Sequence, residues 1–175
     1  MSEETDPSGA VVLCFDGSED SANAIASAGG LLEPRAAVVL TVREPIELWS
    51  LYDPATILDA GLGKLASESL GLEQMADEFA QKQLDRGLEL ARTAGFQARG
   101  RLGRGKAWKE ICEVARELDA AAIVLGARGL SGVRSALLGS VSATVSVHAG
   151  RPVLIVHETA APPRARAEAA GEAQP

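Results

Sequence analysis

The sequence is poor in cysteine, histidine and aromatic residues, and each shortage excludes a class of protein. Two cysteines, Cys14 and Cys112, are too few for a disulfide framework, and we expect both to be small core residues. His148 and His157 have no cysteine or acidic neighbours at metal-ligand spacing, so we expect both to be structural and predict no metal site. Aromatic residues make up 3% of the chain, which predicts a core of Ala, Val, Leu and Ile.

Long apolar runs and an excess of basic residues are also absent. No stretch approaches the roughly 18 apolar residues that a membrane span requires, and the acidic N-terminus lacks the basic and apolar pattern of a signal peptide. The net charge of −7 argues against non-specific binding to nucleic acid. We therefore expect a soluble, cytoplasmic protein that binds neither nucleic acid nor membrane.

The chain does contain short apolar runs that alternate with helical patterns. The apolar runs are typical of parallel strands covered on both faces, except that the run at 96–102 alternates like an exposed edge strand. They occupy 10–15, 36–42, 96–102, 121–126 and 152–157, and helical spacing occupies 18–32, about 67–93, 108–118 and 140–148. In the longest helix, an apolar face is predicted from Leu72, Met75, Phe79, Leu84, Leu88 and Ala91.

This βαβαβαβαβ order predicts an α/β fold, an open, doubly wound, Rossmann-like parallel sheet of five strands. The length of 175 residues favours one domain, over 10–157. The flanking segments 1–9 and 158–175 lack periodicity, so we expect disordered tails. In such sheets ligands bind beyond the carboxyl ends of the strands, where the strand order reverses.

A glycine-rich segment between the run at 121–126 and the helix at 140–148 is the strongest functional signal. It consists of Gly126-Ala127-Arg128-Gly129, nine further residues, and Gly139-Ser140. Glycines let the backbone approach a ligand, and the amides at a helix start attract anionic oxygens. The arrangement suits a nucleotide with an ATP-like phosphate chain.

A second block, Val-Val-Leu-Cys-Phe-Asp-Gly-Ser at 11–18 followed by Ser21 and Ala24, precedes the first helix. Together the two blocks resemble the universal stress protein family, in particular its ATP-binding branch with the motif Gly-x2-Gly-x9-Gly-(Ser/Thr). The resemblance spans about residues 10–157 and implies the strand order 3-2-1-4-5 of the adenine nucleotide alpha hydrolase-like fold. It also implies ATP as ligand and a homodimer through the strand near Pro152–Val156, an apolar edge that favours pairing with a second chain.

The resemblance assigns roles to individual residues. It implies that Asp16 accepts hydrogen bonds from the ribose and that the backbone of Val42 contacts the adenine edge. We expect Gly126 to approach the ribose, and the phosphates to meet Gly129, Gly139, Ser140, Val141 and Ser142. Arg128 and Arg134 are candidates to neutralise phosphate charge, with solvent exposure as the alternative. Mg²⁺ could enter the site bound to the phosphates of ATP.

Three interpretations stay open beside these. Asp16 could also be the N-cap of the first helix, a role that can coexist with a ribose contact because a carboxylate has several acceptor sites. Gly100, Gly105 and Lys106 nearly match a P-loop, but Ala107 replaces its Ser or Thr, so we expect a turn there. The segment 43–67, with Trp49 and Tyr52, has no firm match; it is either a variable surface insertion or a cover over the nucleotide or a partner surface.

For function, the leading hypothesis is an ATP-binding sensor or regulator of a stress response that acts through a regulatory protein partner. The first alternative is a slow Mg-dependent ATP hydrolase or nucleotidyl-transfer enzyme in the same pocket, although no nucleophile or general base is evident. The second is a dimeric scaffold that binds no nucleotide.

Overall fold

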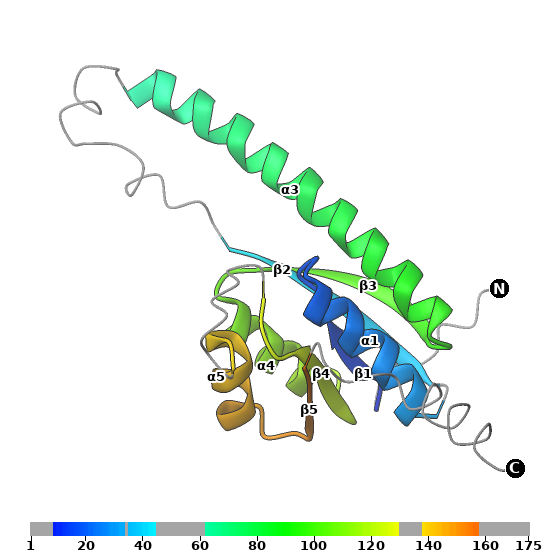
Figure 1. Ribbon diagram of the computed structural model, residues 1–175. Helices are drawn as coiled ribbons and strands as arrows, with labels where there is room; N and C mark the ends of the chain where they lie inside the picture. The colour runs from blue at the N-terminus through cyan, green and yellow to red at the C-terminus, as the bar shows by residue number, and fades with distance from the viewer. Residues whose placement is uncertain (1–8, 34, 45–61, 130–137, 158–175) are drawn as a thin grey trace, which may run out of the picture.

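The computed structural model describes residues 9–33, 35–44, 62–129 and 138–157 (Figure 1). Most of the predicted tails, and residues 45–61 of the segment that begins at Arg43, lie outside these ranges. The strands are β1 (Val11–Cys14), β2 (Ala36–Arg43), β3 (Gln97–Arg104), β4 (Ala122–Gly126) and β5 (Val153–Val156). The helices are α1 (Glu19–Leu31), α3 (Leu62–Thr93), α4 (Ala107–Glu117) and α5 (Ser140–His148).

The five strands form one parallel sheet in the order β3-β2-β1-β4-β5, as predicted. The central strand β1 pairs Val11 with Ala37 of β2 on one side and with Ala122 of β4 on the other. The edge position expected for the alternating run is confirmed, although β3 extends to Arg104, beyond the predicted end. Because the order reverses between β1 and β4, the carboxyl ends of these two strands border the predicted ligand position.

Two aliphatic layers cover the sheet on its opposite faces (Figure 1). Val12 and Cys14 of β1 pack with α4 and α5 on one face, whereas Val11 and Leu13 pack with α1 and α3 on the other. This alternation follows from the two-residue period of a strand buried on both sides. Both cysteines, the second being Cys112 on α4, are buried and free, which confirms their prediction as core residues.

The long helix α3 covers the sheet with only part of its length. Leu84 and Ala91 are buried against the sheet, but Met75 is 68% and Phe79 58% exposed, so the predicted apolar face is buried only in its second half. The first half of α3 extends past the ends of β2 and β3 (Figure 1) and meets them through ion pairs of Glu73 with Arg43 and of Asp77 with Arg104. Within the described ranges, no helix combines the length and the apolar character that crossing a membrane requires.

Candidate functional site

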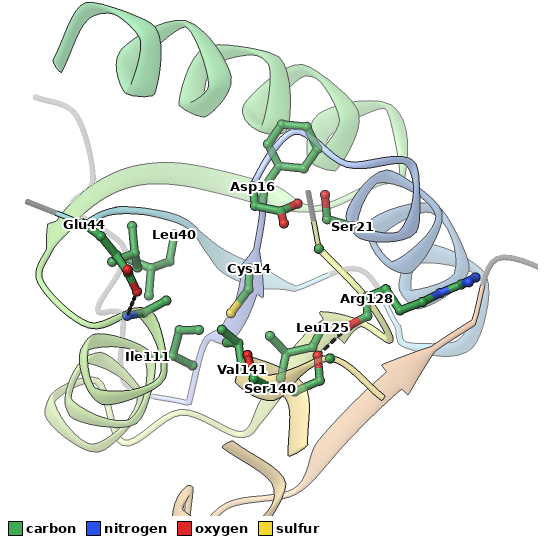
Figure 2. Close-up of a pocket in the computed structure, with 17 residues that line it drawn as sticks. Cys14, Asp16, Ser21, Leu40, Glu44, Ile111, Leu125, Arg128, Ser140 and Val141 are labelled. Atoms are coloured by element: carbon green, nitrogen blue, oxygen red, sulfur yellow. Dashed lines mark hydrogen bonds between the residues drawn. The ribbon is translucent and has the colours of Figure 1, made fainter. Parts of the chain in front are cut away.

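A cavity of about 430 Å³ lies at the carboxyl ends of β1, β2 and β4 (Figure 2). This volume is in the range of small-molecule sites. The structure brings all nine predicted ligand-contacting residues to its wall, namely Asp16, Val42, Gly126, Arg128, Gly129, Gly139, Ser140, Val141 and Ser142. Their roles toward a ligand stay predictions, but their convergence from four separate segments defines one candidate site.

The wall of the cavity has an apolar part and a polar part. The apolar part includes Cys14, Leu40 and Ile111, and Figure 2 shows Glu44 beside Leu40. Burial raises the pKa of the Cys14 thiol well above its ordinary value, and the Asp16 carboxylate raises it further, so this wall carries no thiolate at neutral pH. The polar part includes Asp16, Ser21 and the glycine-containing ends of the loop between β4 and α5.

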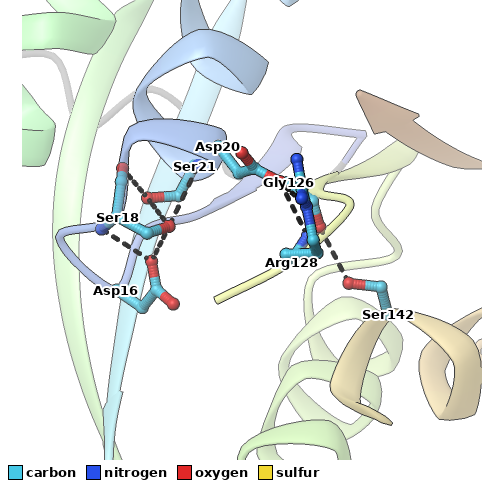
Figure 3. A network of polar contacts seen from close by, with 7 residues as sticks. All are labelled: Asp16, Ser18, Asp20, Ser21, Gly126, Arg128 and Ser142. Carbon is cyan, nitrogen blue, oxygen red and sulfur yellow. Dashed lines mark hydrogen bonds and ion pairs between the residues drawn. The ribbon is translucent and has the colours of Figure 1, made fainter. Parts of the chain in front are cut away.

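A hydrogen-bonded turn between β1 and α1 fixes Asp16. Its Oδ1 accepts from the backbone N–H of Ser18 at 3.0 Å and from the Ser18 hydroxyl at 2.6 Å (Figure 3). Ser18 itself is the N-cap of α1, because its Oγ accepts from the N–H of Ser21 at 3.2 Å. The alternative of Asp16 as the N-cap is therefore wrong: the carboxylate holds the capping serine and borders the cavity.

Gly126 ends β4 in close contact with the first turn of α1. A Cβ atom on Gly126 would lie 2.6 Å from the carbonyl carbon of Asp20 and 2.7 Å from the nitrogen of Ser21. The hydroxyl of Ser142 donates to the carbonyl oxygen of Gly126 at 2.8 Å. Gly126 and Ser142 thus join β4 to α1 and α5, a packing role beside the ligand contacts that the motif predicts.

The two described ends of the glycine loop meet at the start of α5. The N–H of Gly139 donates to the carbonyl of Ala127 at 2.7 Å, and Gly139 is the N-cap of α5 with no side-chain hydrogen bond. The first N–H groups of a helix have no acceptor within the helix, so those after Gly139 suit an anion at this end of the cavity. Residues 130–137, including Arg134, lie outside the described ranges.

Arg128 lies in the motif, but its side chain is paired with an acidic residue of α1. Its Nε lies 3.2 Å from Oδ2 of Asp20, and its backbone N–H donates to the same oxygen at 3.0 Å. The expectation of a fully solvated side chain is wrong, because the guanidinium contacts Asp20, whereas the role of Arg128 toward phosphate stays a prediction. No spacing in the sequence pointed to Asp20, since the contact depends on how α1 packs beside β4.

Glu44 is a second residue that the sequence did not single out. It follows β2 directly and lines the cavity, and its Oε1 accepts from the N–H of Ala107 at 3.3 Å. This contact holds the start of α4 at the rim. The only signal in the sequence was its place after a strand end, where site residues of parallel sheets gather.

The near-match to a P-loop forms no phosphate-binding loop. Gly100 lies inside β3, where a Cβ would be 3.1 Å from side-chain atoms of Leu84 and Leu88. Gly105, with φ +118°, makes the turn into α4, as expected. Among the described residues, no three His, Cys, Asp or Glu side chains gather as metal ligands would.

Comparison with known proteins identifies the family and a relative of this chain. A model of the universal stress protein family matches residues 8–157. The universal stress protein YxiE of Bacillus subtilis is 31% identical over 154 residues, which cover 83% of this chain and 97% of that protein.

Solved structures share the fold at lower identity. The hypothetical protein MJ0577 superposes with a TM-score of 0.69 at 19% identity, covering 90% of this chain and all of that one. A universal stress protein in complex with cAMP gives 0.52 at 24%, covering 87% and 98% of the two chains. The universal stress protein from Archaeoglobus fulgidus in complex with dAMP gives 0.51 at 18%, covering 84% and 96%. At these identities the likeness concerns the fold alone.

Proposed function

This chain belongs to the universal stress protein family, and we propose that it binds an adenine nucleotide in the cavity between β1 and β4. One observation carries the proposal: an apolar wall and a helix N-terminus that suits anions border the same cavity. Structural neighbours in complex with cAMP and dAMP support the choice of an adenine nucleotide.

The arrangement of the wall suggests how the parts of the nucleotide are held. The base lies between Leu40, Ile111 and the backbone of Val42, away from the polar end. The Asp16 carboxylate retains acceptor sites for ribose hydroxyls, since each carboxylate oxygen accepts more than one hydrogen bond. The phosphates lie against Gly129 and the N–H groups that follow Gly139, where the helix dipole of α5 stabilises negative charge.

We further infer that ATP is the ligand, with Mg²⁺ carried on its phosphates, and that the protein is a cytoplasmic sensor or regulator. ATP that binds one conformation of the 126–140 loop more tightly would shift its population and change the surface that a partner protein contacts. The partly exposed edge strand β5 would join two copies. Light scattering that detects only monomer at micromolar concentration would argue against this dimer.

The first experiment identifies the bound nucleotide. Freshly purified, undialysed protein is denatured and the released molecules are analysed by chromatography and mass spectrometry. The test variant is Gly129→Val with Gly139→Val; the control is Gly71→Val, because a Cβ at Gly71 meets no atom within 4 Å. We expect ATP or another adenine nucleotide from the wild type and the control, and none from the double variant.

Other outcomes select other functions. Steady ADP release by the wild type, absent from the double variant, would identify an ATP hydrolase. On the described cavity wall, the carboxylates of Asp16 and Glu44 would then be the candidates for its general base. If neither protein releases nucleotide and calorimetry with Mg-ATP is flat, the binding proposal is wrong. The fold would then be a scaffold.

A further inference from the structure

The contact between Asp20 and Arg128 places a buried carboxylate beside the phosphate end of the cavity. Asp20 is 7% exposed in the first turn of α1, and its Oδ2 accepts from both the backbone N–H and the Nε of Arg128 (Figure 3). The backbone of Asp20 is held by the close packing of Gly126, and its carboxylate is held by the two hydrogen bonds from Arg128. Asp20 is therefore a rigid partner for the Arg128 guanidinium.

The position of this guanidinium matters because of the composition of the wall. Among the described residues that line the cavity, Arg128 is the one cation. Its side chain points away from Cys14 and Leu125 toward α1 (Figure 2). The residue thus lies next to Gly129, where phosphates are expected, while its positive charge faces the Asp20 carboxylate.

We propose that Asp20 sets how strongly the site distinguishes nucleotides by their phosphate charge. The inference rests on the proposed function and deepens it. With Asp20 present, the Arg128 charge is neutralised locally, and the phosphate end holds its ligand mainly through backbone N–H groups. ATP and AMP then bind with similar affinity, although ATP carries more negative charge. Without the Asp20 charge, the phosphate end of the cavity gains one unit of net positive charge, which favours the ligand with more phosphates.

The test compares ATP with AMP, both free of Mg²⁺, by isothermal titration calorimetry. Asp20→Asn keeps the size of the side chain and an oxygen that accepts from the Arg128 N–H, but removes the charge. We expect the ratio of ATP to AMP affinity to rise about fivefold over the wild type. In Asp20→Asn combined with Arg128→Gln, the ratio should return to the wild-type value, because the second change removes the positive charge that Asp20 no longer compensates.

A matched control removes another carboxylate from an arginine. Glu117 accepts two hydrogen bonds from Arg101, both at 2.8 Å, and neither residue lines the cavity. Glu117→Gln should leave the ratio unchanged. If thermal melting shows that Asp20→Asn is not folded, Asp20→Ser is the second variant, with the same expected rise in the ratio of ATP to AMP affinity.

The possible outcomes separate the inference from the proposed function. If folded Asp20→Asn binds both nucleotides with the wild-type ratio, Asp20 sets no charge preference and the inference is wrong, while nucleotide binding stands. The same holds if the rise persists when Arg128→Gln is added. A wild type that binds neither ATP nor AMP overturns both.

Discussion

Gly126→Ala should destabilise the protein although alanine is the smallest possible addition. The new methyl would lie within 3.0 Å of three atoms of α1, two of them in the backbone of Asp20 and Ser21. A backbone cannot rotate aside as a side chain can, so α1 and the end of β4 must separate. Overpacking of this kind costs about 1–3 kcal/mol.

The net effect is slightly smaller, because alanine restricts the unfolded chain more than glycine does. That gain is about 0.4–1 kcal/mol. We therefore expect the free energy of unfolding to fall by about 1–2 kcal/mol. For a chain of 175 residues this corresponds to a decrease in Tm of about 2–8 °C.

Thermal and urea unfolding, followed by circular dichroism, measure this change. Gly71→Ala is the control, since a Cβ there meets nothing within 4 Å on an exposed turn of α3. Alanine in a helix interior is favoured over glycine by about 0.8–1 kcal/mol, so the control should raise the Tm. A Gly126→Ala variant as stable as the wild type would refute the packing argument and return Gly126 to a role in ligand contact alone.

Three more perturbations test the surroundings of the site. Ser142→Ala removes the donor to the buried Gly126 carbonyl and should lower the unfolding free energy in urea by about 1–3 kcal/mol; an unchanged midpoint would contradict this role. Ser18→Ala removes the N-cap of α1 and should cost about 1 kcal/mol, whereas Ser18→Asp, which can still cap, should cost clearly less. Burial raises the pKa of the Cys14 thiol above its ordinary 9.0, so the folded state keeps a proton that the unfolded state loses. The free energy of unfolding should therefore decrease as the pH rises above 9, by up to about 1.4 kcal/mol per pH unit. In urea titrations between about pH 8 and 10.5, Cys14→Ala should show a smaller decrease with pH than the wild type, and equal slopes would contradict the reasoning.

The sheet and the cavity wall could be predicted because both leave local patterns in the sequence. Strands buried on two faces, such as Val11–Cys14, are continuous apolar runs, and parallel strands end at a common edge. The spacing of Gly126, Gly129 and Gly139 then marked which strand ends carry the site. The order of the strands came from the resemblance to the family, which the sheet bears out.

The contacts that escaped prediction are those between distant segments. Asp20 and Arg128 are 108 positions apart, and nothing in either neighbourhood indicates that α1 lies against the end of β4. The same packing makes Gly126 a contact with α1, a role that a glycine pattern cannot distinguish from ligand approach. Met75 and Phe79 have helical spacing, but burial depends on how far the sheet extends beneath α3.

The pairing of β1 with both β2 and β4 has a consequence for synthesis on the ribosome. When residues up to Arg104 have emerged, β3, β2 and β1 can already pair, but the second edge of β1 has no neighbour until Ala122 follows. Contacts between such distant segments form late, because closing the intervening chain costs entropy. The nascent chain therefore passes through a stage with an apolar strand edge open to other chains. The wall of the candidate site is complete only after α5 has been made.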